Sequence, residues 1–130
     1  MVRMQLSDNA LDEIQDFMNL EMDKISEHLH YDMSQKCTTA YEVNAYVNDI
    51  LGHLHMTSEK YYGVIDPDFF EFLTVMFECV SDGLFDDLKI PHEKRNAKDF
   101  TLATSYTYGE IKYKLVRFIA EELYNYFLKY

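Results

Sequence analysis

Residues 66–88, DPDFFEFLTVMFECVSDGLFDDL, form the stretch that decides the fold expected for this chain of 130 residues. Its apolar residues recur at steps of three and four, and at roughly 100° per residue they share one side of a helix. These residues are Phe69, Phe70, Leu73, Met76, Phe77, Val80 and Leu84. Four acidic residues lie opposite: Glu71, Glu78, Asp82 and Asp86. The pattern predicts a central helix with an apolar inner face and a carboxylate stripe toward solvent.

The start of this helix is marked by Asp66 as N-cap and Pro67 at the first helical position, where a missing N–H costs nothing. Gly83 is expected to weaken or kink the helix, which ends before Pro91.

Two amphipathic helices are expected before it. The first follows a cap at Ser7 or Asp8, ends within residues 31–34, and has an apolar face of Leu11, Ile14, Met18, Met22, Ile25 and Leu29. The second begins at a capping box formed by Thr39 and Glu42 and ends near Met56, so that residues 58–65 are a connection.

A last helix begins at a second capping box, Thr107 and Glu110, and runs to the C-terminus. Residues 89–105 are ambiguous, because a basic loop is followed by alternating residues typical of a strand. They form either a functional loop or a short strand, for which residues 2–6 are one conceivable partner.

We therefore predict an all-α, single-domain bundle spanning residues 1–130. It has about four amphipathic helices, with one short strand or an irregular loop before the last helix. The low counts of 4 Gly and 2 Pro favour long helices over a β-sandwich.

Cys37 and Cys79 are the only cysteines, and two isolated thiols do not form a zinc pattern. Two free, buried thiols are expected, with a single disulfide between them as the alternative. The first ten residues lack an apolar leader pattern, and no run of 18 apolar residues is present. These features favour a cytoplasmic protein without a membrane span.

Catalytic and nucleotide-binding motifs are missing from the sequence, including the P-loop and the G-x-S-x-G and G-x-G-x-x-G patterns. Glu27 and His30 have the Glu-x-x-His spacing of di-iron bundles, but a second such pair is missing. We expect no enzyme activity, no cofactor and no metal site.

Charge is distributed unevenly along the chain, whose formal net charge is −11. Residues 1–88 hold 18 Asp and Glu against 4 Lys and Arg, whereas residues 89–130 hold 5 against 8. The acidity opposes direct binding to nucleic acid or to an anionic membrane. It is compatible with a solvated surface, and it favours a basic protein partner.

In size, acidity and lack of catalytic motifs, the chain is similar to small acidic inhibitors of nucleases. These include bacterial immunity proteins and phage-encoded blockers of DNA-acting defences. The similarity is compositional and implies a non-catalytic protein that neutralises a basic toxin, nuclease domain or defence enzyme. The residues expected to bind are Asp66, Asp68, Glu71, Glu78, Asp82 and Asp86, with Tyr61 and Tyr62 as apolar anchors. The alternative is a structural or adaptor subunit that forms a homo-oligomer, with its basic end against the acidic end of another copy.

Overall fold

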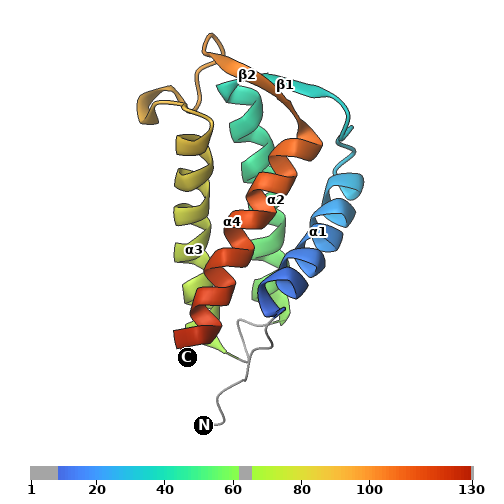
Figure 1. The fold of residues 1–130 in the computed structure, drawn as a ribbon, viewed down its shortest axis with the longest axis vertical. Helices are drawn as coiled ribbons and strands as arrows, with labels where there is room; N and C mark the ends of the chain where they lie inside the picture. The colour runs from blue at the N-terminus through green and yellow to red at the C-terminus, as the bar shows by residue number, and fades with distance from the viewer. Residues whose placement is uncertain (1–8, 62–65, 130) are drawn as a thin grey trace.

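The computed structural model describes residues 9–61 and 66–129, in which four helices run up, down, up and down beneath a two-stranded ribbon (Figure 1). The helices are α1 (Ala10–His28), α2 (Ala40–Tyr61), α3 (Pro67–Asp87) and α4 (Tyr108–Lys129). The strands are β1 (Lys36–Thr39) and β2 (Thr101–Thr107), and a short 3-10 helix, His92–Lys94, precedes β2. The predicted helical bundle with a strand before the last helix is confirmed.

The apolar faces of all four helices meet in one core. Its fully buried side chains include Met22, Val43, Ile50, Val80, Leu84, Ile111, Leu115 and Ile119. Gly83 does not interrupt α3. A Cβ atom at Gly83 would lie 3.2 Å from the ring of Phe118, so the missing side chain lets α3 and α4 approach closely.

The helix starts follow their local sequence. The Phe69 N–H donates to the Asp66 carboxylate (3.1 Å), and the Glu42 N–H donates to the Thr39 hydroxyl (3.3 Å). At α4 the box is reciprocal: the Thr107 N–H donates to Glu110 (2.8 Å), and the Glu110 N–H donates to the Thr107 hydroxyl (3.1 Å). These three predicted starts are confirmed.

The start and end of α1 differ from the expectation. The predicted cap at Ser7 or Asp8 lies outside the described residues, and the N-cap is Asn9, whose side chain makes no capping bond. The helix ends at His28, before residues 31–34, because His30 adopts a positive φ of 63° and the Tyr31 N–H turns back to the Ser26 carbonyl (2.9 Å).

The predicted end of α2 near Met56 is wrong, since the helix continues to Tyr61 and takes in part of the expected connection. The sequence after Met56 has no Gly or Pro before Tyr61, and Glu59 and Lys60 are good helix formers. Threonine hydroxyls can compete with the hydrogen bonds of a helix backbone. The Thr57 hydroxyl instead donates to the His53 carbonyl within the helix (2.9 Å).

The strand alternative for the segment before α4 is confirmed, whereas the partner considered for it stays a prediction. Residues 2–6 lie outside the described part of the chain, and β2 pairs antiparallel with β1, which no sequence pattern predicted. The first residue of α2, Ala40, donates its N–H to the Phe100 carbonyl, and the first residue of α4, Tyr108, donates to the Gln35 carbonyl (both 3.0 Å). The ribbon therefore joins the starts of α2 and α4.

Candidate functional site

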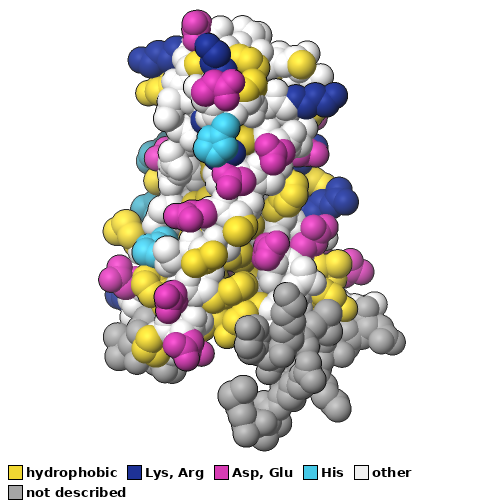
Figure 2. Space-filling view, turned by 90° about the vertical axis from the view of Figure 1, so that its left-hand side faces the viewer, with side chains coloured by type: hydrophobic (Ala, Val, Ile, Leu, Met, Phe, Trp, Pro, Cys, Tyr) yellow, Lys and Arg dark blue, Asp and Glu magenta, His cyan; other side chains and the backbone are white. Residues whose placement is uncertain are grey.

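The outer face of α3 carries a continuous row of exposed residues, which we call the α3 stripe. It consists of Asp68, Glu71, Val75, Glu78, Cys79, Asp82 and Asp86. From Asp68 to Asp86 it extends about 27 Å along the helix axis at 1.5 Å per residue. Figure 2, which faces this side of the bundle, shows carboxylates along the surface with apolar side chains between them. The inner face of the same helix is packed into the core, so the stripe has a rigid support.

Most carboxylates of the α3 stripe have no ion pair with the residues that the structure describes. Asp82 is paired with Arg95, whose Nη1 lies 2.5 Å from its Oδ1 and whose guanidinium covers the ring of Phe85 at 4.9 Å. Within the described part of the chain, no ion pair involves the other acids of the stripe, which are Asp68, Glu71, Glu78 and Asp86. The negative charge of these acids is therefore not compensated along most of α3. At the C-terminal end of the helix, Arg95 from the following loop neutralises part of it.

The remaining residues predicted for binding have different positions. Asp66 is exposed, but its carboxylate caps the helix, so a substitution there changes helix stability as well as surface charge. Tyr61 is the last residue of α2; its side chain and the whole of Tyr62 lie outside the described part of the chain. Their role as anchors stays a prediction.

Sequence reasoning missed the two apolar members of the stripe. Val75 is 56% exposed, and Cys79 is exposed, contrary to the predicted burial of that thiol. The signal was available in the helical count, because Val75 is four residues after Glu71 and three before Glu78, and so lies on their side of the helix. Val75 and Cys79 give the acidic face an apolar centre.

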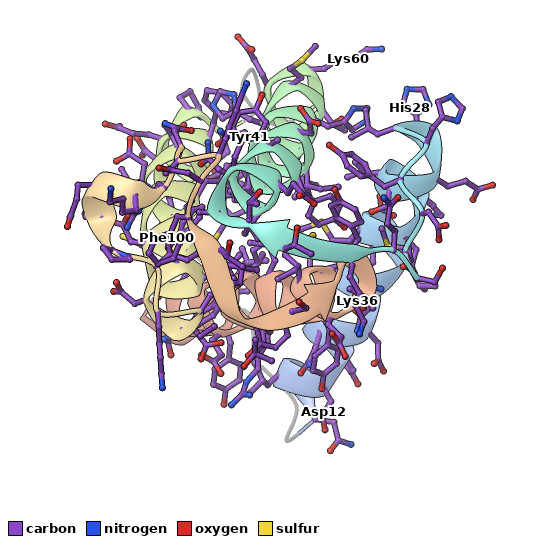
Figure 3. The ribbon with its side chains drawn as sticks, turned by 90° about the horizontal axis from the view of Figure 1, so that it is seen from above. Asp12, His28, Lys36, Tyr41, Lys60 and Phe100 are labelled. Atoms are coloured by element: carbon purple, nitrogen blue, oxygen red, sulfur yellow. The ribbon has the colours of Figure 1, made fainter. Side chains whose placement is uncertain are left out.

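A second acidic face lies on α1, on the opposite side of the bundle from α3 (Figure 3). Its exposed acids are Asp12, Glu13, Asp16, Asp23 and Glu27. Asp23 is paired with Lys112 (2.6 Å). The acids on the outer sides of α1 and α3 thus form two separate surfaces.

Tyr46 and Cys37, which are buried, form a cluster with the half-buried Tyr31 and Tyr108 at the ribbon end of the bundle. The three tyrosine rings contact one another with centroids 4.8 to 5.1 Å apart. Burial raises the pKa of the Cys37 thiol to about 12, although the hydrogen bond from Tyr108 opposes this rise. Burial likewise raises the pKa of Tyr46 and of Tyr108 to about 12. These groups stay protonated and neutral near pH 7, which is typical of a structural cluster.

The two cysteines, both free, are expected to differ in reactivity. In the native chain a thiol reagent such as dithionitrobenzoate should modify Cys79 rapidly and Cys37 only after unfolding, because Cys37 is buried and its pKa is raised. The colour released with and without urea measures this difference. The Cys79→Ser variant should lose the rapid phase; two rapid thiols in the native parent chain would contradict the burial of Cys37.

Residues 9–61 and 66–129 contain no cluster of three or more His, Cys, Asp or Glu side chains that could hold a metal ion. No helix within those residues has the length and apolar character that crossing a membrane requires. Comparisons with protein-family models, curated proteins and solved structures returned no match.

Proposed function

We propose that this protein is a non-catalytic binding protein that attaches to a basic surface of another protein through the α3 stripe and blocks that surface. The observation that carries the proposal is a set of four carboxylates on a helix held by the core, none of which has an ion pair among the described residues: Asp68, Glu71, Glu78 and Asp86. Carboxylates without counter-charges repel one another, and a cationic partner relieves this repulsion.

The mechanism is steric and electrostatic. Long-range attraction speeds the encounter with a positive surface, and the apolar centre formed by Val75 and Cys79 loses its water when the surfaces meet. Because the helix is already ordered, its backbone loses little conformational entropy on binding.

Surfaces rich in Lys and Arg commonly bind the phosphates of nucleic acids. A carboxylate stripe that occupies such a surface excludes the nucleic acid. The partner class that we propose is therefore a nucleic-acid-acting toxin, nuclease domain or defence enzyme, and the protein acts as its immunity or inhibitor protein. This class is supported by the charge and by the row of carboxylates along α3.

The partner is sought by capture from the native host with the tagged chain, at low and at high salt. Recovery of one basic protein at low salt, reduced at high salt, supports the proposal and provides the target for an activity assay. A captured nucleic-acid enzyme should lose activity when the chain is added at equal concentration.

Charge reversal then tests the surface. Glu71→Lys with Glu78→Lys should lower the association rate constant about tenfold or more and flatten its salt dependence, since both residues lie in the stripe and neither has an ion pair within the described chain. This pair is preferable to one that includes Asp82, whose reversal also disturbs Arg95.

The matched control is Glu93→Lys with Asp99→Lys, which changes net charge by the same amount at exposed positions of the loop before β2. Its association rate should stay close to that of the parent chain. Equal slowing by both pairs would show that total charge rather than the α3 stripe governs the encounter.

A further inference from the structure

The outer face of α1 carries two large apolar side chains that lie in solvent. Phe17 and Leu20 are each 61% exposed and are three residues apart, so they adjoin on the helix surface. Two exposed acids adjoin this pair: Glu13 lies four residues before Phe17, and Asp16 lies four residues before Leu20. We call these four residues the α1 ridge: an apolar pair with acidic neighbours.

A surface of opposite character lies where β2 meets α4. It is an open hollow of about 460 Å³ whose lining includes Tyr106, Tyr113, Lys114 and Arg117. Tyr113 is 53% exposed, and the Arg117 side chain is 67% exposed with only a 3.5 Å ion pair to Glu121. Such an exposed pair contributes little and is readily exchanged.

Two cations and one acid line this hollow. Its acid, Glu110, is held by the Thr107 N–H at 2.8 Å as part of the capping box. Lys36, labelled in Figure 3, is exposed and stands opposite Thr107 in the ribbon. Lys114 is paired with Asp87 (2.8 Å), so Lys36 and Arg117 supply the positive charge that this region can offer a partner, whereas the α1 ridge is acidic.

We propose that the occupant of the hollow is the α1 ridge of a second copy of this chain. Phe17 and Leu20 would lie against Tyr106 and Tyr113, and Asp16 would approach Arg117. The signs of the two surfaces are complementary, and each surface combines apolar side chains with charge, as specific interfaces do.

The arrangement that fits is a two-fold dimer. A specific interface buries at least about 1,000 Å², which a single ridge of two apolar side chains does not provide. Since α1 and α4 stand side by side (Figure 3), a two-fold axis lets each copy donate its ridge and receive the other, which doubles the contact. The α3 stripe stays open on the far side, so this inference goes beyond the proposed function and does not depend on it.

The mass of the full chain, measured by sedimentation over a range of concentrations and salt, tests the dimer. The parent chain should form a dimer that weakens as salt rises. Phe17→Ser with Leu20→Ser should be monomeric at every concentration at which the parent is dimeric. Met56→Ser replaces a 71% exposed apolar residue of α2 and should leave the dimer intact. A monomeric parent chain, or a series of ever larger species, would overturn the proposal.

A charge exchange tests the pairing of the two surfaces. Asp16→Lys and Arg117→Glu should each be monomeric, because like charges then face each other across both contacts. An equimolar mixture of the two variants should form a mixed dimer. In it, one contact keeps the parent pair of Asp16 and Arg117, and the other contact has the same pair of charges with the signs exchanged. Two variants that remain monomeric when mixed would overturn this pairing. Binding of a basic partner by these variants is measured in a separate experiment. It tests the proposed role of the α3 stripe, and its result does not depend on whether the dimer forms.

Discussion

Replacing Tyr46 by alanine is expected to lower the free energy of unfolding by about 3–5 kcal/mol, a large share of the roughly 5–15 kcal/mol typical of a domain. Tyr46 is the largest of the fully buried side chains and contacts the rings of Tyr31 and Tyr108. The substitution leaves a cavity under the ribbon and also removes the partner of the buried Ser26 hydroxyl (2.9 Å). Urea unfolding followed by circular dichroism measures the loss.

Two milder variants separate packing from hydrogen bonding at this position. Tyr46→Phe keeps the ring but leaves the Ser26 hydroxyl without this partner, at a cost of about 1–3 kcal/mol. Adding Ser26→Ala removes the unsatisfied group, so the double variant should lose less than the sum of the single losses. Additive losses would contradict a direct bond between the two hydroxyls.

Stability is also expected to fall as pH rises from about 9 to about 12. Folding raises the pKa of Cys37 from its ordinary 9.0, and those of Tyr46 and Tyr108 from 10.0, in each case to about 12. Between the ordinary and raised values the unfolded chain has released protons that the folded chain still holds. The folded state then binds more protons than the unfolded state, so its stability decreases with rising pH. Below pH 9 these groups are protonated in both states and contribute no slope.

Urea midpoints measured at intervals from pH 8 to pH 11 would follow this loss. Cys37→Ala removes the group that titrates first in the unfolded chain, so the decline should begin nearer pH 10 than pH 9. A midpoint that stays constant over the whole range would contradict the raised pKa values of this cluster.

The features predicted correctly from sequence are those set by neighbouring residues. At Asp66, Thr39 and Thr107, the side chain of the cap accepts a hydrogen bond from the N–H group three residues later in the sequence. The apolar faces follow from the helical period. The end of α1 was harder to predict, because His30 occupies a positive-φ position where glycine is usual.

Features that depend on distant segments could not be predicted in this way. β1 is four residues long and lacks an alternating apolar pattern, so its pairing with β2 has no local signal. The periodicity placed acids on the outer sides of α1 and α3 but could not show that these sides face away from each other. The exposure of Phe17 and Leu20 likewise depends on which helices pack beside α1.

The ribbon also constrains the order in which the chain can fold. It pairs residues that are 62 to 71 positions apart in the sequence, so its closure carries a loop entropy cost that local helix formation does not. Its hydrogen bonds include the first residues of both α2 and α4. A register slip of one residue would therefore move one strand, and the helix start attached to it, by about 3.3 Å and would turn the side chains of that strand to the opposite face. The apolar faces would then no longer meet. A chain that closes the ribbon in a wrong register must reopen it before the core can form, and only the native register lets the ribbon and the core form together.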